Sequence, residues 1–251
     1  RETIDTLLLA WPLVVAQLAQ MALPMTDIIL LGGLGPEAVA SGALAVNLYN
    51  TFMLFGVGIM SATMPMVARQ RGRMRHSVRD LRRTLRQALW VAVSVALPMW
   101  VILWFGEPIF LALGQDPEVS HRAAGFLRLL MWGLLPFFGF VALRSFIAAL
   151  ERPAWTLIVG LSAIPVNAGL AWSLIHGRFG LPALGAVGPA LATSLTMAFL
   201  FVGLALVLVS ERRFRRYRLF GRFWRPDWQR YREFWRLGLP IALMIVFETS
   251  I

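Results

Sequence analysis

The sequence predicts an all-α membrane protein that crosses the bilayer several times. Apolar residues make up 58% of the 251-residue chain and charged residues only 15%, which excludes an ordinary soluble domain. The net charge is nevertheless +11, and all 24 basic residues are arginine. Eighteen of these arginines lie in two windows, 69–86 and 212–236, which long apolar stretches separate. Apolar spans joined by charged loops are typical of a polytopic membrane protein.

Six apolar stretches are long enough to cross the membrane, because a spanning helix needs about 20 residues. They are residues 7–31, 39–67, 88–113, 123–150, 154–175 and 184–209. A seventh stretch opens at Leu237 and is still apolar at Ile251. The chain also begins with Arg1 rather than methionine, so we expect a fragment of a longer protein. The expected parts are a lobe of six transmembrane helices (1–210), a basic cytoplasmic connector (211–236) and the start of a second lobe (237–251).

The arginine windows also predict the orientation of the chain in the membrane. They fall in the second-to-third and sixth-to-seventh connections, whereas the third-to-fourth connection sets Glu107, Asp116 and Glu118 against Arg122 alone. Since cytoplasmic loops are enriched in basic residues, we expect both arginine-rich connections and the N-terminus on the cytoplasmic side. Arg122 and Arg178 are the exceptions on the opposite side.

Of the 13 acidic residues, eleven sit in loops or at span ends, and two, Asp27 and Glu248, do not. An ionisable group inside a bilayer costs at least ~2.5–3.5 kcal/mol, so each should face a cavity or a charged partner. Near Asp27, Pro24 lacks a backbone donor and leaves the carbonyl of Gln20 unpaired. The amide, carbonyl and carboxylate oxygens of this segment suit Na⁺ or a proton relay.

Other interpretations of the polar residues in the spans stay open. The intramembrane acids could form structural ion pairs with Arg128 or Arg144 of the fourth span. The amides of Asn47, Asn50 and Asn167 could form interhelical hydrogen bonds rather than a binding site.

The sequence offers little sign of other chemistry. It has no cysteine, and its three histidines fall at loops or span ends, so we expect neither disulfides nor a zinc site. There is no phosphate-binding loop, nucleophile elbow or pair of catalytic carboxylates, so we expect neither an enzyme nor a bound cofactor. The connector interleaves arginine with aromatic residues. Between two spans, this pattern indicates contact with anionic lipid rather than nucleic acid.

Several segments, in order along essentially the whole chain, resemble those of multidrug and toxic compound extrusion (MATE) transporters, particularly the NorM branch. These segments are TDIILLGGLG (26–35), FGVG (55–58), MPMVA (64–68), ALRSF (142–146), GRFGLPALGAVG (177–188) and FETS (247–250). The resemblance implies a twelve-helix, two-lobed antiporter of the bacterial inner membrane, of which this chain is the first lobe and the start of the second.

The resemblance also implies roles for individual residues. Asp27, Asn167 and Thr193 fall on the cation site of the first lobe, and Glu248 falls on an acid of the seventh helix. Position 171 departs from the pattern, because family members often carry a carboxylate or amide where this chain has Ala171. The implied activity is the export of organic cations or drugs in exchange for Na⁺ or H⁺.

We expect Gln20, Pro24 and Asn47 to line the substrate cavity, with Na⁺ or H⁺ as the coupling ion, bound at Asp27 or Glu248. The expected partners are cationic small molecules and membrane lipids, and the protein is expected to be a monomer. The alternative is a lipid-linked oligosaccharide flippase of the same superfamily. That function needs a strongly cationic cavity for pyrophosphate, which only two intramembrane arginines could supply. A scaffold or receptor without transport would leave the intramembrane acids unexplained.

Overall fold

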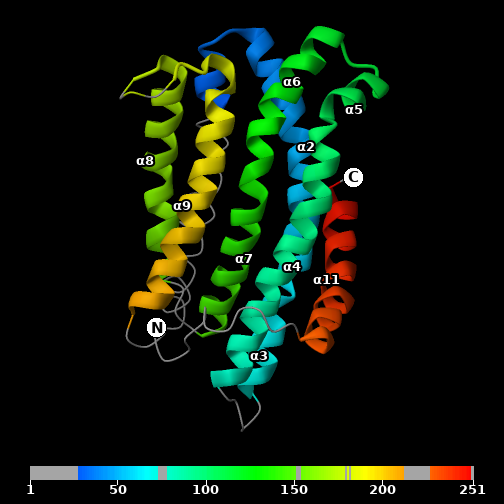
Figure 1. Cartoon of the computed structure of the whole chain (residues 1–251), viewed down its shortest axis with the longest axis vertical. Coiled ribbons are helices and arrows are strands. Elements are labelled where there is room, and N and C mark those ends of the chain that lie inside the picture. The colour runs from blue at the N-terminus through cyan, green and yellow to red at the C-terminus, as the bar shows by residue number, and fades with distance from the viewer. Residues whose placement is uncertain are drawn as a thin grey trace, which may run out of the picture.

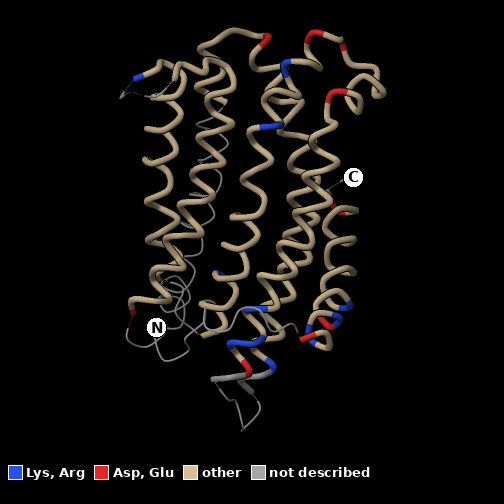
Figure 2. Tube along the Cα trace, viewed as in Figure 1, with Lys and Arg blue, Asp and Glu red and all other residues tan. Residues whose placement is uncertain are grey.

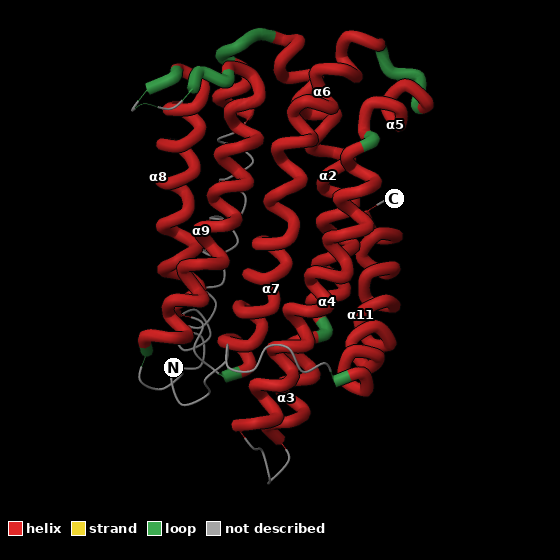
Figure 3. The backbone as a smooth tube through the Cα atoms, viewed as in Figure 1, coloured by secondary structure: helices red, strands yellow, loops and turns green. Residues whose placement is uncertain are grey.

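The computed structural model describes residues 28–72, 78–150, 154–178, 180, 182–211 and 227–249. Within these ranges the chain is a bundle of helices with no strand, which confirms the predicted all-α class (Figures 1 and 3). Five helical segments there are long and apolar enough to cross a membrane: Pro36–Arg69, Asp80–Trp104, Pro117–Ala149, Ala154–His176 and Gly185–Ser210. They correspond to the second to sixth predicted spans. Most of the first predicted span, 7–31, lies outside the described residues.

The second span consists of α2 (Pro36–Ser61) and α3 (Thr63–Gly72). Pro36 suits the first position of a helix, where a backbone N–H would have no helical partner. Gly35 precedes it with φ 106°, a conformation that favours glycine. Pro65 lies in the first turn of α3 and cannot donate to the carbonyl of Ser61, so the two helices are separated at Ala62.

The third predicted span, 88–113, is divided between two helices, α4 (Val78–Trp104) and α5 (Gly106–Ala112). Pro108 cannot donate a backbone hydrogen bond to the Trp104 carbonyl, and the chain turns at Phe105. The short helix α5 then packs on the fourth span, where a Cβ on Gly106 would lie 2.6 Å from the Leu127 side chain. The apolar run therefore ends with a helix that caps one end of the bundle (Figure 1).

The fourth span is interrupted near its middle. It consists of α6 (Pro117–Leu130), a 3₁₀ turn η1 (Met131–Gly133) and α7 (Leu134–Ala149). Pro136 lacks the N–H that would bond to the carbonyl of residue 132. Neighbouring helices stabilise the break: the Ser194 hydroxyl donates to the Leu129 carbonyl at 2.7 Å, and Trp100 Nε1 donates to the Met131 carbonyl at 2.8 Å.

Two antiparallel helices, α8 (Ala154–His176) and α9 (Gly188–Ser210, preceded by the turn η2, Gly185–Val187), form one side of the bundle (Figure 1). Small residues allow their close approach. A Cβ on Gly203 would lie 2.9 Å from Val159, and one on Gly188 would lie 3.1 Å from the backbone of Ile175. Close packing through small residues is typical of helix pairs in membranes.

The last described helix, α11 (Trp228–Thr249), begins upstream of Leu237, so the end of the expected connector is helical and continuous with the described part of the predicted seventh span. It lies against α2 and α4 (Figure 1). A Cβ on Gly58 would come within 2.3 Å of the Ala242 backbone, and one on Gly238 within 2.7 Å of the Ile59 carbonyl oxygen. The two glycines therefore determine how closely α11 approaches α2.

Charged residues gather at the two ends of the bundle (Figure 2). One end, called here the arginine-rich end, is formed by α3 and the starts of α4 and α11. The opposite, acidic end carries Glu37, Glu107, Asp116 and Glu118. The described parts of both arginine windows thus lie on the same side of the bundle, as the predicted topology requires.

Candidate functional site: a cavity between α2, α7, α8 and α9

A cavity of about 530 Å³ lies inside the bundle, between α2, α7, α8 and α9. Most of its wall is apolar and includes Phe137, Phe140 and Met197. A few polar side chains from all four helices also line it: Asn47, Tyr49, Asn50, Arg144, Thr156 and Thr193. An apolar cavity with a few convergent polar groups is the usual form of a small-molecule site.

The structure brings together two of the predicted site residues, Asn167 on α8 and Thr193 on α9. Asn167 is fully buried, and its Nδ2 donates to Thr193 Oγ1 at 3.3 Å. Its Oδ1 atom is also buried and accepts no hydrogen bond from the described residues. Leaving a buried acceptor unpaired costs about 1–3 kcal/mol, so this oxygen is suited to receive a cation or a water molecule. Pro165 precedes this site in α8 and cannot donate to the carbonyl of Leu161, a cavity residue.

Ala171 lies one turn after Asn167 on the same face of α8. It is fully buried and packs with Leu174 and Ala192. A methyl group therefore occupies the position where the family resemblance leads one to expect an oxygen ligand. The described oxygen donors of the candidate site, Asn167 Oδ1 and Thr193 Oγ1, are both neutral. Any formal negative charge must come from another residue.

The remaining predicted site residues do not all line this cavity. Asn47, predicted to line the substrate cavity, is among the residues that line this cavity. Gln20, Pro24 and Asp27 lie outside the described residues, although Ile28, the residue after Asp27, lines the cavity. Glu248 is exposed near the end of α11 and is not among the residues that line this cavity. No group of three or more His, Asp or Glu side chains in the described ranges could hold a metal ion.

The two arginines of the fourth span lie in different surroundings. Arg144 lines the cavity, with its guanidinium carbon 5.8 Å from the centroid of the Phe140 ring. Arg128 is 44% exposed, lies 4.0 Å from Glu107 and stacks over Trp104. Arg144 is therefore the one cationic residue in the described lining of the cavity.

Sequence reasoning missed two hydroxyl groups of the cavity, those of Tyr49 and Thr156. Both oxygens are buried and have no hydrogen-bond partner among the described residues. Tyr49 could have been noticed, because it is the one tyrosine within the predicted spans. Thr156 carried no such signal, because it stands at the start of a span, where polar residues are common.

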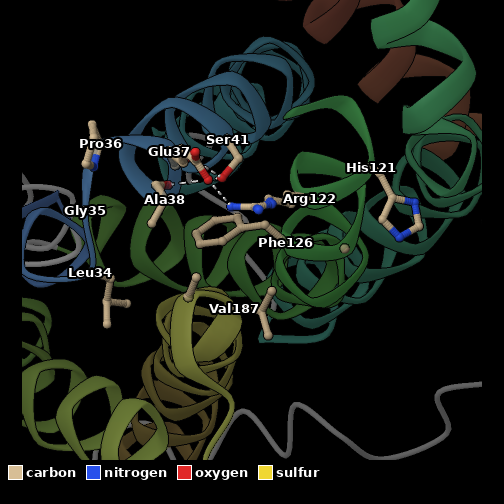
Figure 4. A pocket seen from close by; sticks show the side chains of 12 residues that line it. Leu34, Gly35, Pro36, Glu37, Ala38, Ser41, His121, Arg122, Phe126 and Val187 are labelled. Carbon is tan, nitrogen blue, oxygen red and sulfur yellow. Dashed lines mark hydrogen bonds and ion pairs between the residues drawn. The ribbon is translucent and has the colours of Figure 1, made fainter. Parts of the chain in front are cut away.

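A second, open pocket of about 440 Å³ lies at the acidic end, between α2 and α6 (Figure 4). Arg122 extends across it, with Nη1 2.5 Å from Glu37 Oε2 and Nη2 2.7 Å from Glu118 Oε1. This arginine was an exception to the predicted charge asymmetry. Its two carboxylate partners compensate its positive charge, so the acidic end stays net negative around it.

Comparisons with known proteins agree with this architecture. The MatE family model matches residues 12–173, more than half of the chain. The chain belongs to the MatE family. Curated relatives named "Probable multidrug resistance protein NorM" include one from Mesorhizobium japonicum, 52% identical over 98% of this chain, and one from Brucella suis, 50% identical over the whole chain. Each alignment covers 53% of the relative, so the chain spans about half their length.

Solved structures of MATE transporters share the fold. The eukaryotic transporter AtDTX14 superposes with a TM-score of 0.81 at 22% identity, over 99% of this chain and 54% of that protein. The transporter NorM-NG, solved in a complex that includes a monobody, gives 0.77 at 26% identity, over 96% of this chain and 52% of that protein. These names describe transporters rather than enzymes, as the sequence led us to expect. The resemblance to the NorM branch is confirmed, and the spanning helices together with these relatives indicate a multi-pass membrane protein.

Proposed function

We propose that the protein exports organic cations across the bacterial inner membrane in exchange for Na⁺ or H⁺, by alternating access. The observation that carries this proposal is the Asn167–Thr193 pair: Thr193 lines the cavity, and the buried amide oxygen of Asn167 has no hydrogen-bond partner among the described residues. Two further observations support it. The relatives are named for multidrug resistance. The chain also shares its fold with MATE family transporter structures, one described as inward-facing and one as outward-facing, with TM-scores of 0.78 and 0.77 at 20% identity.

Coupling between ion and substrate follows from the chemistry of the donors. Neutral oxygens alone bind Na⁺ weakly, and a carboxylate supplies the missing charge. Asp27, which precedes the cavity residue Ile28, is the carboxylate proposed for this role. An ion that binds one conformation more tightly than the other shifts the equilibrium between them and so drives the substrate. Glu248 is proposed as the corresponding acid of the second lobe.

The cavity wall favours flat, apolar substrates. Phe137, Phe140 and Met197 provide aromatic and polarisable surface that tolerates varied shapes. A flat aromatic cation such as ethidium suits this wall and, because it is fluorescent, is a convenient first probe. The flippase alternative would require several cationic groups to hold a pyrophosphate, and the described lining of the cavity offers one, Arg144. The proposal therefore stays with organic cations.

Transport by the full-length protein in liposomes tests the proposal. We expect Asp27→Asn and Asn167→Leu to reduce dye efflux under an imposed Na⁺ or pH gradient at least tenfold, and Glu248→Gln to reduce it less. Thr193→Val should act in the same direction, because it removes a hydroxyl that Asn167 contacts. Thr51→Val is the matched control, since its hydroxyl bonds to the Asn47 carbonyl on an exposed part of α2. Wild-type rates for both Asp27→Asn and Asn167→Leu under either gradient would contradict the proposed site.

The proposed orientation places the arginine-rich end in the cytoplasm. Reporter fusions to the full-length protein after Arg83 should then give a cytoplasmic signal, and a fusion after Asp116 a periplasmic one. A cytoplasmic signal at Asp116 would reverse the orientation. We further propose that the protein acts as a monomer and that its basic connector contacts anionic lipids.

A further inference from the structure

Arg230, in the first turn of α11, forms bonds to two residues of α4 that lie 146 and 150 positions earlier in the sequence. Its Nη2 lies 2.7 Å from Asp80 Oδ1, and its Nη1 donates to the Asp80 carbonyl at 2.6 Å and to Thr84 Oγ1 at 2.9 Å. On its own helix, Arg230 Nε lies 3.3 Å from Asp227 Oδ2. We call these four residues the Arg230 network. They use all three nitrogens of the guanidinium group.

The Arg230 network is partly shielded from water. The side chain of Arg230 is 17% exposed, that of Asp227 26% and that of Asp80 38%, while Thr84 is fully buried. Charge-assisted hydrogen bonds at such a site are stronger than those of exposed ion pairs, because water competes less for the same groups. A second, exposed pair, Arg69 with Glu233 at 3.4 Å, joins α3 to α11 on the same end.

These bonds connect the two proposed lobes. α11 begins the second lobe, whereas α3 and α4 belong to the first. Further along α11, the glycine contacts at Gly58 and Gly238 place it directly on α2. In this conformation the arginine-rich end of α11 is therefore attached to the first lobe by both packing and charge.

We propose that Arg230 is a gating residue: its bonds to Asp80 and Thr84 hold the cytoplasmic end of the transporter closed, and they break when the cavity opens inward. This proposal rests on the alternating access proposed above. Asp227 has a different role from Asp80, because it lies on the same helix as Arg230 and moves with it. When α11 leaves α4, Asp227 still neutralises the guanidinium group. Asp80 thus stabilises the conformation in which the cytoplasmic end is closed. Asp227 lowers the free energy of the conformation in which that end is open.

The two carboxylates therefore give opposite predictions. Asp80→Asn, Thr84→Val and Arg230→Lys, which lose all or part of the α4 bonds, should increase cytoplasmic opening. Asp227→Asn leaves the bonds between Arg230 and α4 in place. It removes the carboxylate that would neutralise Arg230 in the open conformation, and should therefore decrease cytoplasmic opening. A merely structural pair would respond in the same direction to the loss of either carboxylate.

The test is site-directed labelling of the full-length protein in membrane vesicles. This chain contains no cysteine, so a Leu157→Cys substitution introduces a single labelled position in the cavity lining once any cysteine in the rest of the protein is replaced. We expect Asp80→Asn to accelerate labelling by an impermeant maleimide from the cytoplasmic face about three- to tenfold and to slow labelling from the other face. Asp227→Asn should slow cytoplasmic labelling. Arg122→Gln, which removes one positive charge at the acidic end, is the control and should change neither rate.

Labelling needs neither substrate nor ion gradient, so the gate can be tested separately from the proposed transport. Shifted labelling without dye efflux would uphold the gate and contradict the proposed function. The gating proposal is overturned if Asp80→Asn and Asp227→Asn change the rates in the same direction, or if all variants label like the parent. Thermal stability of each variant in detergent separates these outcomes from misfolding, and Arg230→Lys retains the charge if Asp80→Asn does not fold.

Discussion

Each end of the bundle has an arginine that binds two carboxylates, and the two arrangements differ in their surroundings. At the acidic end, Arg122 is 48% exposed and its partners Glu37 and Glu118 are more than 70% exposed. At the arginine-rich end, Arg230 is 17% exposed and also donates to a backbone carbonyl and a buried hydroxyl. Water competes for the first set of bonds far more than for the second. The arginine–carboxylate distances at the two ends are similar. The Arg122 pairs are nevertheless surface contacts, whereas the Arg230 bonds hold two helices together at a less exposed site.

The elements that the two arginines join also differ. Arg122 links α2 to α6, both within the proposed first lobe, and these helices already pack together. Arg230 links that lobe to α11, the helix proposed to begin the second lobe. Changes at the arginine-rich end should therefore alter how the lobes fit together, whereas changes at the acidic end should not.

The largest effect is expected from Gly58→Val, which blocks the contact between α2 and α11. Its Cβ would lie 2.3 Å from the Ala242 backbone, which cannot move as a flexible side chain would. We expect a loss of about 1–3 kcal/mol in the stability of the full-length protein, measured as a lower midpoint of thermal unfolding in detergent. Gly169→Val is the matched control, because no atom of the described residues lies within 4 Å of a Cβ there. Equal effects of the two substitutions would show that α11 does not depend on this close packing.

A smaller effect is expected from Trp100→Phe, within the bundle. The change removes the 2.8 Å bond from Nε1 to the Met131 carbonyl, at the break of the fourth span, but keeps an aromatic ring beside Trp132. The loss should be about 0.5–1.5 kcal/mol, the usual net value of one hydrogen bond. Trp132→Phe changes the other ring of the same pair, which is 52% exposed, and should cost less. If Trp132→Phe destabilises more, ring packing rather than the carbonyl bond stabilises the break.

The smallest effect is expected from Arg122→Gln at the acidic end. Because Arg122 and both of its partners are well exposed, the thermal midpoint should stay the same within error at ordinary salt. Any small change should disappear as the salt concentration rises. A large, salt-independent loss would mean that the two ends are more alike than their exposure suggests.

The sequence predicted the fold class, most of the spans and the proximity of two polar residues, for reasons that particular residues make clear. Long apolar stretches identify spans because lipid contact requires them, and arginine windows identify which ends lie together. The same signals misplaced the end of the third span, since hydropathy alone does not reveal the turn that Pro108 causes before α5. Asn167 and Thr193 are 26 positions apart, and their pairing was expected only from the family resemblance. The structure confirms that they meet, while Asp27 remains a prediction.

Long-range polar contacts could not be predicted in this way. Arg230 is one of ten arginines in its window, and nothing in its local sequence distinguishes it or points to Asp80. Its role depends on how α11 packs against α4, and that packing depends in turn on Gly58 and Gly238. Arg122 was similarly visible only as an exception, although its spacing of four residues from Glu118 is the one that allows pairing on a helix.

The spans differ in length, and this has a consequence for the surrounding bilayer. The segments Pro36–Arg69 and Pro117–Ala149 contain 34 and 33 residues, whereas Ala154–His176 contains 23. At about 1.5 Å per residue, the two longer segments contain roughly 50 Å of helix along the chain, divided at Ala62 and at η1, against a hydrocarbon core of about 30 Å. Thickening the bilayer would cover apolar turns of the long helices but leave the short helix mismatched, so the two sides of the bundle would respond unequally. Lipid chain length is thus expected to tilt α8 relative to α2 without any ligand being present.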